Sequence, residues 1–134
     1  MKNIKFLFAA LALLFVSTFA SAQVKDWKEK NDFHKVMSTT FHPAEEGNLA
    51  PIKSKIDEMQ AKAIAFQKSE IPVDVVNKKE VKKNLKELVK GTKALNKKIK
   101  ANASDEVIKS ELTSLHDVFH KIVGLCNAED EHAH

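Results

Sequence analysis

The segment SDEVIKSELTSLHDVFHKIVGLC, residues 104–126, has the pattern of an amphipathic helix. Ser104 is a favourable N-cap, and Asp105 and Glu106 stand in the first turn, where the helix dipole favours negative charge. The apolar residues recur at alternating intervals of four and three, which places them on one helical face. They are Ile108, Leu112, Leu115, Phe119, Ile122 and Cys126. The segment therefore predicts a helix that buries this face against other helices.

Two segments upstream show the same alternation. The segment from Pro51 to Lys68 begins with proline, which suits the first turn of a helix. Its apolar stripe is Ile52, Ile56, Met59, Ala63 and Phe66. The next segment begins near Asn77, three residues before Glu80, as in a capping box. Its stripe is Val81, Leu85, Leu88, Thr92, Leu95 and Ile99. Lysines cover its other faces, as expected for a solvated helix surface.

A fourth helix is predicted over residues 24–41, where the helical period links Val24, Trp27, His34, Met37 and Phe41. Loops are expected at 43–50 and 69–76, which contain Pro43, Gly47 and Pro72. The chain has only 3 Gly and 3 Pro, too few turn residues for a many-stranded β fold. Four amphipathic helices with short connections predict an all-α, antiparallel up-down-up-down four-helix bundle over residues 23–126.

The two ends of the chain are predicted to lie outside the bundle. Residues 1–22 have the pattern of a cleavable signal peptide: basic Lys2 and Lys5, an apolar run over 6–16, and a small-residue cleavage site at 20–22. The apolar run is too short for a transmembrane helix. We therefore expect a protein exported to the periplasm of a Gram-negative bacterium, with no membrane span after cleavage. Residues 127–134 are expected to form a flexible acidic tail containing His132 and His134.

The composition excludes several classes of function. All 22 basic residues are Lys, and the missing Arg argues against specific recognition of phosphates or bases. Cleavage at residue 22 would remove two of these Lys and halve the formal net charge of +4. Together with export, this argues against a nucleic-acid partner. The single Cys excludes an internal disulfide framework and a cysteine-only zinc finger.

Four of the 6 His fall on the first and last predicted helices, which are adjacent and antiparallel in this architecture. His34 is expected at a core position of the first helix, at the height of His120 on the last. His116 and His120 are four apart and share one face. His42 ends the first helix, about 12 Å along its axis from His34. We expect His34 to pair with His120 and His42 with His116, as two sites or one elongated site.

Imidazole is a good ligand for zinc, copper, nickel and iron. Met37 lies one turn from His34, and Cys126 lies beyond His120; both are soft ligands that would favour copper or heme iron. We therefore predict a transition-metal site with His34, His116 and His120 as core ligands, assisted by His42 and by Met37 or Cys126. The competing interpretation is that each His is an amphipathic residue near the bundle surface, where intermediate burial of His is common.

Residues 59–68 and 112–120 resemble the small periplasmic four-helix cytochromes, namely the soluble b-type cytochrome and the cytochrome c-prime superfamily. The resemblance implies a non-covalent heme b. His120 matches the family's axial His in the fourth helix, and the axial Met position falls near His34. The second axial ligand would then be His34, or Met37 as the alternative. The chain has no C-x-x-C-H motif, which excludes covalent attachment.

These observations leave three hypotheses. The first is an exported protein that binds a copper or zinc ion for sequestration, delivery or sensing, with a metal-transfer or redox protein as its partner. The second is a b-type cytochrome that carries electrons. The third is a ligand-free structural or chaperone-like envelope protein whose Lys-rich faces bind acidic partners. An enzyme is not expected, because no acid–base or nucleophile set is visible.

Overall fold

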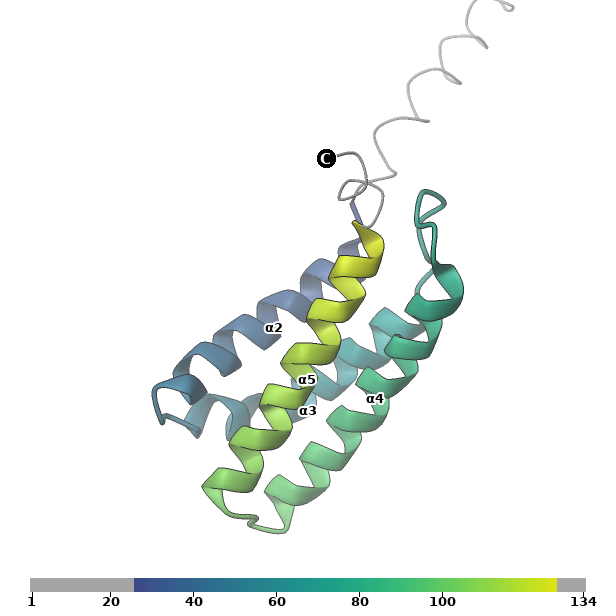
Figure 1. Cartoon of the computed structure of the whole chain (residues 1–134). Helices are drawn as coiled ribbons and strands as arrows, with labels where there is room; N and C mark the ends of the chain where they lie inside the picture. Colours follow the sequence, from purple (N-terminus) through teal and green to yellow (C-terminus); the bar gives the residue numbers. More distant parts are fainter. Residues whose placement is uncertain (1–25, 128–134) are drawn as a thin grey trace, which may run out of the picture.

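A computed structural model describes residues 26–127 of the chain, and within this range the structure is all-α. The four helices are α2 (Lys28–Glu45), α3 (Ala50–Lys68), α4 (Lys78–Lys100) and α5 (Asp105–Cys126). The chain reverses direction at each connection, and α2 meets α5 to close the ring of helices (Figure 1). The predicted four-helix bundle is confirmed. The predicted signal peptide, and the tail beyond Asn127, lie outside the described residues.

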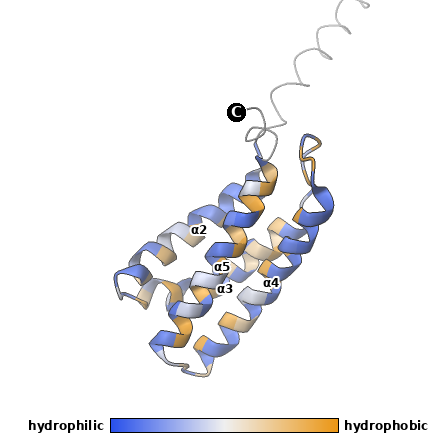
Figure 2. Cartoon of the chain, in the orientation of Figure 1, coloured by the Kyte–Doolittle hydropathy of each residue, from blue (hydrophilic) through white to orange (hydrophobic). Residues whose placement is uncertain are grey.

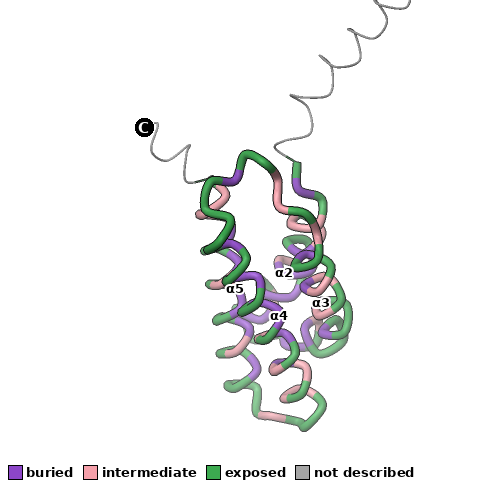
Figure 3. The backbone as a smooth tube through the Cα atoms, turned by 90° about the vertical axis from the view of Figure 1, so that its right-hand side faces the viewer, coloured by how far each residue is buried: buried purple, intermediate pink, exposed green. Residues whose placement is uncertain are grey.

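The predicted apolar stripes form the core. In α3 all five stripe residues are buried, and in α5 all except the half-buried Cys126 are buried. Polar residues cover most of the outer surface, and the buried positions run along the inside of the bundle (Figures 2 and 3). None of the helices in residues 26–127 is long and apolar enough to cross a membrane.

The first helix is displaced from its predicted bounds, 24–41, because Pro43 does not end it. The helix continues through Pro43 and ends at Glu45. Gly47 follows with φ +91°, a left-handed conformation that glycine adopts without strain. Its amide donates to the Ala44 carbonyl at 3.0 Å, and the amide of Asn48 donates to the Pro43 carbonyl at 2.9 Å. These two bonds form a Schellman motif, so Gly47 is the helix stop.

The caps agree with the sequence analysis at one helix and not at another. The Ser104 hydroxyl accepts a hydrogen bond from the Val107 amide at 3.3 Å, so the predicted N-cap of α5 is confirmed. The predicted capping box of α4 is wrong, because the Asn77 side chain makes no cap hydrogen bond. Asn77 has φ −98° and ψ 55°, outside the extended conformation in which an N-cap side chain usually reaches the helix amides.

Gly91 permits a close approach between α4 and α5. A Cβ atom at this position would lie 2.5 Å from Cδ2 of Leu115. Carbon atoms pack at about 3.5–4.0 Å, so Leu115 uses the space that the missing side chain leaves. Gly91 therefore lets α5 sit closely against α4. By contrast, α2 and α5 approach each other least among the four neighbouring pairs.

Two glycine substitutions test the role of Gly47. We expect Gly47→Ala to lower the free energy of unfolding by about 1–2 kcal/mol, because an L-residue is strained at positive φ. Gly124→Ala, inside α5, is the matched control, since an added Cβ meets nothing within 4 Å at either position. This variant should gain roughly 0.5–1 kcal/mol in helix propensity. Urea unfolding followed by circular dichroism measures both, and a Gly47→Ala protein as stable as the wild type would contradict the assignment.

Candidate metal-binding site

The seam between α2 and α5 is filled by aromatic rings. The His116 imidazole stacks on the Phe41 ring with centroids 3.8 Å apart and an interplanar angle of 7°. One level away, His34 stacks on Phe119 at 5.5 Å and 19°. Each stack joins a residue of α2 to a residue of α5. The antiparallel neighbourhood expected for these helices therefore brings histidines from both to one seam.

His116 and His120 form the closest pair of imidazoles in this seam. Their spacing of four residues places them on one face of α5, and their Nε2 atoms lie 3.1 Å apart. Two nitrogens bound to one metal at about 2.0–2.1 Å lie about 2.9 Å apart in a square plane and about 3.4 Å apart in a tetrahedron. The observed separation falls between these values. Without a metal, one Nε2–H donates to the other Nε2.

The surroundings of His116 favour its neutral form. Burial lowers the pKa of His116, and the neighbouring His120 lowers it further. Asp117 and Glu45 act in the opposite direction, and His42 adds a small lowering. A metal binds the neutral imidazole. The lowered pKa of His116 therefore keeps its lone pair available to lower pH than an unperturbed His would.

Two groups from the end of α2 act on His116. Both His42 and Glu45 act electrostatically on His116 from the last turn of α2. They also contact each other, with Nδ1 of His42 3.5 Å from Oε1 of Glu45. Glu45 was not among the predicted ligands, because the sequence analysis placed it in a loop after Pro43. Its spacing of three residues from His42 would have indicated that the two side chains share a helix face, if the helix had been predicted to continue past Pro43.

Other predicted ligands lie elsewhere. His34 is exposed, so its predicted core position is wrong: stacking on Phe119 leaves its outer side in solvent. Met37 is only 1% exposed and packs in the core. Cys126 is half-buried about 9 Å along the axis from His120, and burial raises the pKa of its thiol. Within residues 26–127, no three or more His, Cys, Asp or Glu side chains are gathered as a metal site.

The interior beside the seam is occupied by three phenylalanines. The Phe33 ring lies 5.3 Å from Phe119 and 6.1 Å from Phe66, and the latter two rings are 6.3 Å apart. A heme held between His34 and His120 would have to displace this cluster.

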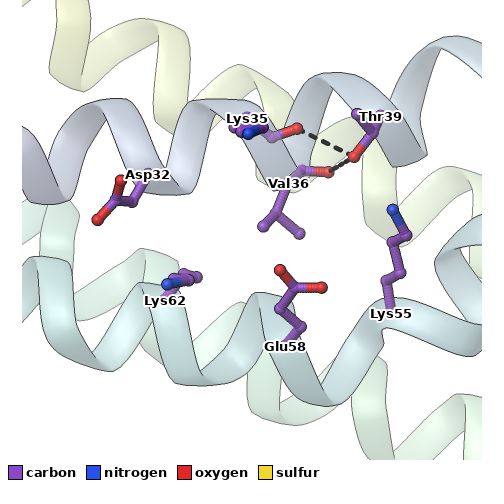
Figure 4. A pocket seen from close by; sticks show the side chains of 7 residues that line it. All are labelled: Asp32, Lys35, Val36, Thr39, Lys55, Glu58 and Lys62. Atoms are coloured by element: carbon purple, nitrogen blue, oxygen red, sulfur yellow. Dashed lines mark hydrogen bonds between the residues drawn. The ribbon is translucent and has the colours of Figure 1, made fainter.

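A surface hollow of about 250 Å³ lies between α2 and α3. Asp32, Lys35, Lys55, Glu58 and Lys62 line it with charges of both signs (Figure 4). Asp32 is paired with Lys28 at 2.7 Å, and the Thr39 hydroxyl donates to backbone carbonyls of its own helix. Asp32 and Thr39 thus already have partners on α2. We interpret the hollow as a solvated, charged part of the surface between two helices.

The lowered pKa of His116 predicts a pH dependence. The unfolded chain binds the proton at the ordinary His pKa of about 6.5, whereas the folded protein binds it only at lower pH. Stability is therefore lost as the pH falls from 7.5 to 5.5. His116→Gln should flatten this dependence in urea unfolding. In NMR titrations, the pKa of His116 should lie below 6.5 and rise in His120→Gln; a midpoint above 6.5 would contradict the structure.

The three comparisons with known proteins found no match. No protein-family model, curated protein or solved structure matches the chain. The resemblance to four-helix periplasmic cytochromes remains a prediction, and the function is argued from the site's own geometry.

Proposed function

We propose that this protein binds a transition-metal ion, zinc or copper, with His116 and His120 as the anchoring ligands. The observation that carries the proposal is the 3.1 Å separation of their Nε2 atoms, which corresponds to two adjacent positions in a metal's coordination sphere. The stack of His116 on Phe41 fixes one imidazole before the metal arrives. A fixed ligand loses less conformational entropy on binding.

His42 and Glu45 complete the site in this proposal. Their side chains are 70% and 54% exposed, so both are free to change rotamer. A turn of these side chains toward the pair adds an imidazole nitrogen and a carboxylate oxygen. Nitrogen and oxygen ligands suit Zn²⁺ and Cu²⁺, whereas Cu⁺ prefers sulfur. The burial of Met37 and the distance of Cys126 leave the pair without a sulfur ligand.

The position of the site favours sequestration, delivery or sensing of the ion over catalysis. His120 is exposed at the surface, so the ion can exchange with solvent or with a metal-transfer protein. The predicted signal peptide places this exchange in the periplasm. The protein would then hold metal in that compartment and pass it on without chemical turnover.

Metal titration of the mature protein tests the proposal. A hundredfold excess of Zn²⁺ or Cu²⁺ over Kd should stabilise the fold by about 2.7 kcal/mol and raise Tm by roughly 10 °C. His116→Gln and His120→Gln should each abolish most of the shift. His34→Gln is the control, because it removes an imidazole from the same seam but not from the pair.

Two further measurements make this test decisive. A chain ending at Asn127 must keep the shift, since the removed segment contains His132 and His134. An optical spectrum after heme addition distinguishes the cytochrome hypothesis, which requires a Soret band that His120→Ala changes. An unaltered metal-induced Tm shift in the double variant H116Q/H120Q would refute the proposed site.

Substitutions at the end of α2 test the additional ligands. Glu45→Gln and His42→Gln should each weaken Zn²⁺ binding by about tenfold, because losing one metal contact or its orientation typically has this effect. Glu46→Gln is the matched control: it removes the next carboxylate, which is also exposed and is not among the groups that act on the pKa of His116. Isothermal calorimetry measures the affinities. Equal loss in all three variants would show only a general charge effect.

A further inference from the structure

The outward face of α4 carries lysine and no acid. The helix contains ten Lys and two Glu. At about 100° per residue, eight of these lysines fall within an arc about 100° wide, opposite the buried stripe. One of the eight, Lys100 in the last turn, pairs with Asp57 of α3, and the other seven form one group. They are Lys79, Lys82, Lys83, Lys86, Lys90, Lys93 and Lys97, here called the lysine face. All seven are exposed, and both Glu residues of the helix fall outside the arc.

The lysine face has no ion-pair partner in the part of the chain that the structure describes. Two other α4 lysines form ion pairs: Lys98, outside the arc, pairs with Glu111 of α5, and Lys100, at the edge of the arc in the last turn, pairs with Asp57 of α3. These pairs lie on the two flanks where α4 meets its neighbours. The acidic partners of α4 therefore lie at its contacts with α3 and α5, while the face directed away from the bundle keeps its positive charge. It extends about 27 Å along the axis.

Exposed apolar side chains stand at one end of this face. The connection between α3 and α4, residues 69–77, extends beyond the start of α4 (Figure 1). Val73 is 75% exposed and Val76 is 58% exposed, the two most exposed large hydrophobic residues described. Apolar side chains have no counterpart on a soluble polyanion such as heparin. They do have one at the boundary between headgroups and acyl chains in a bilayer.

We propose that the lysine face docks this protein on the surface of an anionic phospholipid bilayer, with Val73 and Val76 inserting at the headgroup level. Lysine suits this partner, because a compact point charge needs no fixed geometry with the phosphate that it meets. A row of seven charges matches a negative surface rather than a single bound ion, and each Lys near such a surface adds to the attraction. The proposal is independent of the metal site.

The arrangement of the helices determines where the His pair would lie when the lysine face is docked on a membrane. The lysine face points away from the bundle on α4, whereas the His pair lies in the seam between α2 and α5. In the ring of helices α4 is diagonal to α2 (Figure 1). A protein held by the lysine face would therefore keep His116 and His120 open to the aqueous phase.

Vesicle sedimentation with the mature protein tests this proposal. The probes are vesicles of equal phosphatidylglycerol and phosphatidylcholine, and vesicles of phosphatidylcholine alone, at low and high salt. We expect binding only to the anionic vesicles, weakened at least tenfold by 0.5 M salt because exposed charges are screened. The triple variant K83Q/K86Q/K90Q should also lose at least tenfold in affinity. Glutamine keeps the helix propensity, and circular dichroism verifies the fold.

Two controls distinguish the lysine face from other exposed lysines, and a bilayer from other anionic partners. The variant K55Q/K109Q/K121Q removes the same charge from exposed positions outside α4 and should bind as the wild type does. V73S/V76S should weaken vesicle binding severalfold and leave binding to heparin unchanged. No binding to anionic vesicles, equal losses in both triple variants, or no effect of V73S/V76S on vesicle binding would each overturn the proposal.

Discussion

The contact among Phe33, Phe66 and Phe119 holds three of the four helices at one level of the bundle. These rings come from α2, α3 and α5, and each lies within 6.3 Å of the other two. The contact matters most at the α2–α5 seam, where the backbones approach least. At the opposite seam, Gly91 lets Leu115 of α5 approach α4 directly. The bundle is thus closed by backbone proximity on one side of α5 and by aromatic side chains on the other.

The candidate site is a consequence of that wide seam. Phe119 belongs to the core cluster on one side and carries the stacked His34 on the other. Phe41, a buried residue of α2 outside that cluster, stacks on His116 and thereby holds its imidazole beside His120. The stacking partly desolvates His116, which lowers its pKa and favours the neutral state that a metal requires. Phe41 and Phe119 therefore both pack in the interior of the bundle and position a histidine at the seam.

Charge is distributed unequally around the bundle. The carboxylates near the His pair, Glu45 and Asp117, come from α2 and α5. The lysine face lies on α4, directed away from the other helices. In this arrangement the proposed cation site and the lysine face lie in a small domain without facing each other, and each could meet a different partner.

The four helices and their buried faces could be predicted from the sequence, because a 3.6-residue period leaves a clear apolar stripe in each segment. Residues 52–66 of α3 lie where that period puts them, and Ser104 caps α5 as its side chain predicts. The end of α2 is only partly predictable: Pro43 predicts a stop, whereas the Schellman bonds at Gly47 decide where the helix ends. Local signals compete there, and packing of the buried Ala44 favours the longer helix.

At the histidine site, too, local sequence signals predict one part of the geometry and tertiary packing decides the rest. The sequence determined that His116 and His120 share a face of one helix, because an i, i+4 spacing has that geometry in any α-helix. Only the tertiary structure decided which other residues lie near them. It put Glu45 and His42 in the last turn of α2, where both act electrostatically on His116, left His34 exposed on Phe119 and kept Met37 in the core. Such choices depend on how far apart two helices pack and how each is rotated, and a period along one chain segment does not contain that information.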